Sequence, residues 1–189
     1  MKKLSVSYLY LLLTVSSYTY ANSDLGISEF NAPEELTALS ELNTGNDNHA
    51  IVELTNSTNS SVIILQNNVN GAGSNKAKVQ QTGYENNAII AQVGSSNIGL
   101  VIQDGINNHA SLEQWGANHE GAIIQNGNDN IAHLKQTGNG KKNAVNQTGD
   151  SNIAAAVNKS NGAGFSINQT GNQGIILVNG MDRFISIIN

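Results

Sequence analysis

Glutamine recurs at a fixed spacing along most of this chain, and that spacing limits the possible fold more than any other feature. The glutamines lie eleven residues apart, and Asn158 replaces one of them. The series comprises Gln81, Gln92, Gln103, Gln114, Gln125, Gln136, Gln147, Asn158 and Gln169. A constant period is typical of proteins in which each repeat is one structural unit that packs on its neighbours. The sequence therefore predicts a repeat array rather than one globular core.

Three further positions of the repeat hold the same kind of residue in most units, and the unit reads Q-x-G-x-x-N-x-A-x-x-x-Q. The glycine position, two residues after each glutamine, holds Gly83, Gly94, Gly105, Gly116, Gly127, Gly138, Gly149, Ser160 and Gly171. The asparagine position, five residues after, holds Asn86, Asn97, Asn108, His119, Asn130, Lys141, Asn152, Ala163 and Gly174. The small-residue position, seven residues after, holds Ala88, Gly99, Ala110, Gly121, Ala132, Asn143, Ala154, Phe165 and Ile176.

Upstream of Gln81 the repeat continues less regularly. Asn70, Asn75 and Ala77 lead into Gln81, and we expect an insertion of a few residues near residues 67–70. One earlier unit comprises Asn43, Gly45, Asn48, Ala50 and Leu54, and a weaker one comprises Leu54, Asn59, Ser61 and Leu65. The predicted array therefore covers residues 43–189.

Each unit also alternates with period two, which is the pattern of a β-strand with two different faces. One face carries the asparagine, small-residue and glutamine positions together with a core position, the fifth of each strand. The core position holds Val52, Ile63, Val79, Ile90, Val101, Leu112, Ile123, Leu134, Val145, Ala156, Ile167 and Val178. The other face varies from strand to strand, for example Lys76 with Lys78 and His109 with Glu113. We therefore expect the constant face to be buried.

The strands are separated by four residues of which the second is glycine, as expected for a tight turn with a positive φ. An antiparallel meander would leave the row of aliphatic residues uncovered, which a soluble monomer does not tolerate. If each turn instead crosses to a facing sheet, two eleven-residue units form one 22-residue rung. The predicted fold is therefore an all-β, cross-β-like β-solenoid whose two parallel sheets face each other.

Stacking of such rungs would place identical amides above one another at the spacing of the backbone hydrogen bonds, about 4.8 Å. The two glutamine positions of a rung would form separate ladders, with Gln92, Gln114 and Gln136 in one and Gln81, Gln103, Gln125 and Gln147 in the other. We expect self-assembly to use these ladders, Gln169, and the asparagines Asn75, Asn86, Asn97, Asn108, Asn130 and Asn152.

The start of the chain differs from the array. Lys2 and Lys3 precede an apolar run that ends in small residues near Ala21, so residues 1–21 are predicted to be a secretory signal peptide. Residues 22–42 contain five acidic residues and no basic one, whereas residues 43–189 are close to neutral. The chain lacks the basic surface that nucleic-acid binding requires. It has no cysteine, so disulfides and thiolate metal sites are excluded.

Other kinds of site find little support in the sequence. His109 and His133 would lie one rung apart but two positions out of line, so we predict no metal site. Calcium-binding solenoid repeats need paired glycines and an aspartate in each unit. Ice-binding solenoids would need threonines along exposed strands, whereas Thr82, Thr137 and Thr148 fall in turns. No catalytic or cofactor-binding motif is present, so we expect neither enzymatic activity nor a cofactor.

The repeat resembles that of the curlins, the subunits of bacterial curli amyloid fibres, in which Ser-x5-Gln-x-Gly-x2-Asn-x-Ala-x3-Gln recurs. The leading "DLGISEFNAPEELTALSEL" is similar to the acidic segment of the minor curli subunit. The resemblance implies a secreted protein of the outer cell surface that nucleates the major curlin into extracellular functional amyloid, used in adhesion and biofilm. It also implies a secretion pore and surface-anchoring accessory proteins as partners. A major structural curlin and a surface solenoid adhesin remain alternatives.

Overall fold

The computed structural model describes residues 38–39, 47–69, 73–159 and 164–179, and most of the described residues belong to twelve strands. The strands are β1 (His49–Thr58), β2 (Ser61–Asn67), β3 (Lys76–Tyr84), β4 (Asn87–Ser95), β5 (Ile98–Ile106), β6 (His109–Ala117), β7 (Glu120–Asn126), β8 (Ile131–Asn139), β9 (Lys142–Thr148), β10 (Ile153–Asn158), β11 (Phe165–Thr170) and β12 (Gly174–Asn179). The predicted signal peptide, most of the acidic segment and Asn43, Gly45, Asn70, Ser160 and Ala163 lie outside the described residues.

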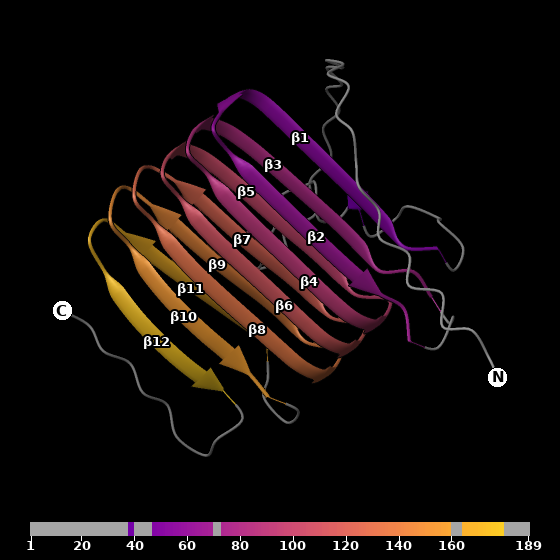
Figure 1. Cartoon of the computed structure of the whole chain (residues 1–189). Helices are drawn as coiled ribbons and strands as arrows, with labels where there is room; N and C mark the ends of the chain where they lie inside the picture. Colours follow the sequence, from indigo (N-terminus) through magenta and orange to yellow (C-terminus); the bar gives the residue numbers. More distant parts are fainter. Residues whose placement is uncertain (1–37, 40–46, 70–72, 160–163, 180–189) are drawn as a thin grey trace.

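The strands form two six-stranded parallel sheets (Figure 1). The odd-strand sheet has the order β1-β3-β5-β7-β9-β11, and the even-strand sheet has the order β2-β4-β6-β8-β10-β12. Consecutive strands therefore belong to opposite sheets. Hydrogen-bonded neighbours from β3 to β11 are offset by one rung of two repeat units, as Gln81 and Gln103 are. The prediction of a β-solenoid with two parallel sheets and 22-residue rungs is confirmed.

The constant face of the repeat forms the core between the sheets. Its buried aliphatic residues are Ala77, Val79, Ala88, Ile90, Val101, Ala110, Leu112, Ile123, Ala132, Leu134, Val145, Ala154, Ala156 and Ile167. A smaller cluster of Leu100, Ala122 and Ala144 is buried on the outer face of the odd-strand sheet. This second cluster belongs to the variable face and was not expected from the repeat.

The second strand has the opposite orientation to the one that the repeat predicts. Ile63 and Leu65, expected to face inward with Ser61, are 45% and 56% exposed. Val62, Ile64 and Gln66 instead align with Ala88, Ile90 and Gln92. The cause is a bulge in β1 between Thr55 and Ser57, because one extra residue turns every following side chain to the other face. Gln66 therefore takes the glutamine position that the repeat assigns to Asn70.

The last strand is displaced by one residue. Ala154 aligns with Ile175 and Ala156 with Leu177, so the predicted assignments of Gly174, Ile176 and Val178 to inward positions are wrong. Ile176 is 60% exposed, and Gln173 takes the asparagine position. The turn before β12 is one residue shorter than the others, and its tight bend is made by Asn172 at a φ of 50°.

Each regular turn uses two residues with positive φ. The first is the glycine of the repeat, with φ values such as 128° at Gly105. The second directly precedes the asparagine position and comprises Glu85, Ser96, Asn107, Asn118, Asp129, Gly140 and Ser151. The glycines are also required by space, because a Cβ on Gly105 would lie 2.0 Å from the carbonyl oxygen of Gly127 in the next rung.

The close approach between turns predicts a strong effect of Gly105→Ala. We expect it to destabilise the fold by at least about 1–3 kcal/mol, the usual cost of a strained backbone, with the steric clash in addition. Gly174→Ala is the control, because nothing lies within 4 Å of its added Cβ and its φ is not positive. Denaturant unfolding followed by circular dichroism would measure both variants. Equal stability of the two would contradict the turn geometry.

Candidate functional site: stacked amides and open edges

The glutamine side chains form a hydrogen-bonded ladder inside each sheet. In the odd-strand sheet, the Nε2 of Gln103 donates to the Oε1 of Gln125 at 2.8 Å, and the contact recurs from Gln81 to Gln169 at 2.7–2.8 Å. In the even-strand sheet, the ladder runs from Gln66 through Gln92 and Gln114 to Gln136 at 2.7–2.8 Å. Burial of these amides costs little free energy because each is satisfied by the next rung.

The same amides also join the two sheets. The Nε2 of Gln103 donates to the carbonyl oxygens of Asn87 and Asn108, each at 3.0 Å. Asn87 begins β4 and Asn108 directly precedes β6, so both acceptors belong to the opposite sheet. Each glutamine therefore ties its own rung to the facing sheet and to the following rung.

The asparagines fix the turns. The backbone N–H of Asn130 donates to the Oδ1 of Asn108 one rung before it, and Asn152 does the same to Asn130. The Nδ2 of Asn108 donates to the carbonyl oxygen of Gly127 at 2.7 Å. Asn75, Asn86, Asn97 and Asn130 make the equivalent bond to Gly94, Gly105, Gly116 and Gly149. The asparagine ladder thus holds the glycine turns in register.

Two residues at the asparagine position, Ser60 and Gln173, are not asparagines and do not fit the eleven-residue spacing. Ser60 accepts the backbone N–H of Asn86, and the backbone N–H of Gln173 donates to the Oδ1 of Asn152. Both positions follow a turn of irregular length. The sequence pattern alone did not reveal them, because a fixed period cannot follow a one-residue insertion or deletion.

His119 replaces asparagine and reproduces its hydrogen bonds. Its Nδ1 accepts the backbone N–H of Lys141 at 3.2 Å, and its Nε2 lies 3.3 Å from the carbonyl oxygen of Trp115. The neutral ring with hydrogen on Nε2 satisfies both contacts, whereas a protonated ring has no acceptor for Lys141. Burial lowers the pKa of the fully buried His119 below 6.5, and the charge of Lys141 lowers it further.

The glutamine ladder of the odd-strand sheet ends at β1, where Leu54 takes the glutamine position and aligns with Gln81. As a result, the buried Oε1 of Gln81 has no hydrogen-bond partner. In the even-strand sheet, Asn158 aligns with Gln136 and its Nδ2 donates to the Oδ1 of Asn143 at 2.9 Å. Among the described strands, β1, β2, β11 and β12 each pair on one side alone.

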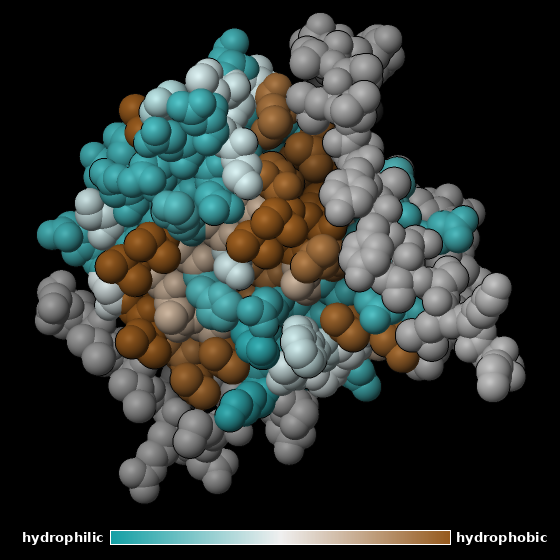
Figure 2. All heavy atoms as spheres, viewed as in Figure 1, coloured by the Kyte–Doolittle hydropathy of each residue, from teal (hydrophilic) through white to brown (hydrophobic). Residues whose placement is uncertain are grey.

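The outer face of the even-strand sheet carries both hydrophobic and polar patches (Figure 2). The exposed apolar residues include Ile63 and Leu65 on β2 and Ile153 and Ile176 on β10 and β12. Between them, Lys135 on β8 pairs with Glu113 at 2.8 Å and lies 4.8 Å from the ring centre of Trp115. Cross-rung contacts of this kind stabilise the register on the solvent side.

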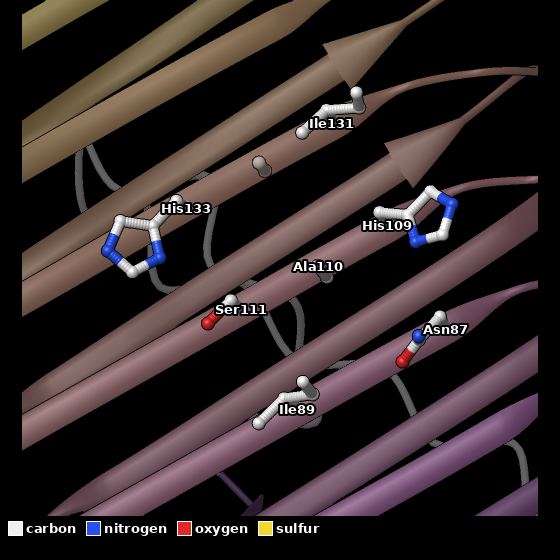
Figure 3. A pocket seen from close by; sticks show the side chains of 8 residues that line it. Asn87, Ile89, His109, Ala110, Ser111, Ile131 and His133 are labelled. Carbon is white, nitrogen blue, oxygen red and sulfur yellow. The ribbon is translucent and has the colours of Figure 1, made fainter.

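The histidines of this face line a shallow groove but do not converge (Figure 3). His109 aligns with Ile131, and Ser111 aligns with His133, so the two rings are two positions out of line and point apart. In the described part of the chain, no three metal-ligating side chains gather. Among the same residues, no helix is both long and apolar enough to cross a bilayer.

The glutamine ladder predicts that Gln103→Ala destabilises the solenoid by about 1–3 kcal/mol, because the Oε1 of Gln125 and two backbone carbonyls lose a donor. Ser111→Ala, on the outer face, should change the stability by less than about 0.5 kcal/mol. Chemical denaturation of the two variants provides the comparison. A loss for Ser111→Ala as large as that for Gln103→Ala would exclude the ladder as the cause.

The environment of His119 predicts a loss of stability in acid. The unfolded chain takes up the proton near pH 6.5 and the folded chain does so only at lower pH. The free energy of unfolding should therefore fall as the pH drops below 6.5, until the pKa of the folded state is passed. His119→Asn should remove this component. Unfolding curves between pH 7.5 and 4.5 test this, and identical pH profiles of the two proteins would contradict it.

Comparison with known proteins agrees with this architecture. The model of the curlin associated repeat matches residues 73–105, 83–116 and 105–138. No curated protein and no solved structure matches the chain. The matched segments span strands β3 to β8, which contain the regular glutamine, glycine and asparagine positions. These matches, together with the paired parallel sheets of the solenoid, show that the chain contains curlin associated repeats.

Proposed function

We propose that the protein is a non-catalytic, secreted curli subunit that nucleates the polymerisation of a major curlin at the outer cell surface. The observation that carries this proposal is the glutamine ladder of the odd-strand sheet, which reaches the last described rung at Gln169. The strand that bears it, β11, pairs with β9 alone among the described strands. An edge of this kind offers unpaired backbone groups and an amide already in register.

The physical basis of nucleation is the cost of the first rung. A free curlin chain must order a whole rung before any amide finds its partner in a second one, and that ordering opposes folding by about 1–2 kcal/mol for each residue. A preformed edge supplies the partner at once. Each residue that joins it gains a backbone hydrogen bond, and every eleventh gains a glutamine contact. Templating therefore removes the slow step of assembly.

The partners and location follow from the family. We propose the major curlin as the templated chain, and a secretion pore with surface-anchoring accessory proteins as the route of export and attachment. The product would be an extracellular amyloid fimbrium that serves adhesion and biofilm formation. The support is the match to the curlin associated repeat together with the predicted signal peptide at residues 1–21.

A bulk structural subunit is the second candidate. It is favoured by the regular rungs from β3 to β10, where every alignment shifts by the same two repeat units without a bulge. A bulk subunit must present matching edges at both ends. The two candidates therefore differ in whether the protein polymerises by itself or starts the polymer of another chain.

Seeding tests the proposal. Purified protein is added at about one part in a hundred to freshly unfolded major curlin, and thioflavin T fluorescence follows assembly. We expect the lag phase to disappear.

The matched control is the Gln103→Ala variant, which should leave a measurable lag because its less stable solenoid presents fewer ordered edges, whereas Ser111→Ala should seed like the wild type. An unchanged lag with wild-type protein would overturn nucleation. Rapid fibre formation by this protein alone would favour the bulk subunit.

A further inference from the structure

The two ends of the solenoid differ in their amides. Throughout the odd-strand sheet, from Gln81 to Gln169, each glutamine Nε2 donates to the Oε1 of the glutamine in the next rung. The ladder is therefore polar, with donors directed toward β11 and acceptors toward β1. These strands lie at opposite ends of the stack (Figure 1). A chain that adds beyond β11 must accept a hydrogen bond, and one that adds before β1 must donate it.

The β11 end is prepared for such an addition. The Nε2 of Gln169 donates to the carbonyl oxygens of Ile153 and Gln173 at 3.0 and 2.7 Å. Gln103 in the interior makes the same two kinds of contact and a third, to the Oε1 of the next glutamine. Gln169 thus makes both backbone contacts of an interior glutamine, and among the described residues its Nε2 lacks the third contact, the one to a glutamine of a following rung.

The β1 end is irregular in three respects. Leu54 cannot donate to a glutamine, and it leaves the Oε1 of Gln81 without a partner. The bulge between Thr55 and Ser57 breaks the register of the edge strand. The alignment from β1 to β3, in which His49 meets Lys76, also shifts by more than the two repeat units that separate β3 from β5. Bulges and broken pairing are the usual means by which natural proteins block an exposed edge.

A second copy of the chain does not fit the β11 end well. Continuation of the solenoid would place β1 of the second copy on β11, and hence Leu54 beside Gln169. It would also place β2 on β12, where Asn179 occupies the glutamine position facing Gln66. Neither sheet would continue its glutamine ladder. The ends of this chain are therefore poorly matched to each other.

We propose that the edge formed by β11 and β12 is the growing edge, and that its partner is a different curlin-repeat chain with glutamine at the position of Leu54. Growth from this protein then proceeds in one direction, and the protein lies at a fibre end rather than along the fibre. This inference rests on the proposed nucleation and assigns it to one edge. The first rung, blocked at Leu54, becomes the end that does not grow.

Single-fibre imaging tests the direction. The chain has no cysteine, so Ser111→Cys on the outer face provides one site for a fluorophore, and the major curlin carries a second colour. We expect each labelled nucleator to lie at one end of its fibre. Gln169→Leu, which places at β11 the residue found at position 54, should slow growth by at least roughly fivefold, because the contact to the added glutamine is lost together with those to Ile153 and Gln173. Ser166→Leu, an exposed residue of the same strand, should have little effect.

Leu54→Gln gives the complementary result. It restores a donor for the Oε1 of Gln81, so labelled nucleators should become more frequent within fibres. Wild-type nucleators found within fibres that extend equally in both directions, with normal growth from Gln169→Leu, would overturn the inference and leave nucleation intact. An absence of fibres on every nucleator would overturn the proposed nucleation and the inference with it.

Discussion

The hydrogen bond between glutamine amides of successive rungs is the interaction on which the solenoid depends. Each rung buries a core aliphatic residue such as Val101 beside a glutamine such as Gln103. Burial of the aliphatic side chain contributes about 1.5–3 kcal/mol, and an unsatisfied buried amide costs about 1–3 kcal/mol. The two nearly cancel in an isolated rung. Stacking removes the cost of the amide, so the fold gains stability chiefly when a second rung is present.

This balance links the fold to assembly. Interior rungs are satisfied on both sides, whereas an end rung carries a cost that a further chain can remove. The protein modifies this cost locally. Leu54 ends the ladder at β1 with an apolar side chain, whereas at β11 the last described rung still carries a glutamine, Gln169. His119 keeps the ladder intact only while it is neutral. Replacement of a single repeat residue thus changes at which rung the amide ladder ends, or at which pH it is intact.

The sequence predicted the solenoid, the two-unit rung and the buried face, because the glutamine and core positions recur without interruption from Val79 to Gln147. It failed where the turn length changes. The bulge beside Ser57 turned Ile63 outward, and the short turn at Asn172 displaced β12 by one residue. Period counting assumes a constant unit and cannot place an insertion within it. The polarity of the amide ladder, which decides between the two edges, also requires the side-chain geometry.

Spin labelling most directly tests whether rungs of two repeat units stack in parallel. Ser111 and His133 are aligned neighbours on the outer face of the even-strand sheet, so nitroxides at these two positions should lie on strands about 4.8 Å apart and broaden each other's spectrum strongly. Labels at Ser111 and Asn126 should show no such broadening, because they belong to opposite sheets. Strong broadening for Ser111 with Asn126, and none for Ser111 with His133, would indicate antiparallel pairing of consecutive strands and contradict the solenoid.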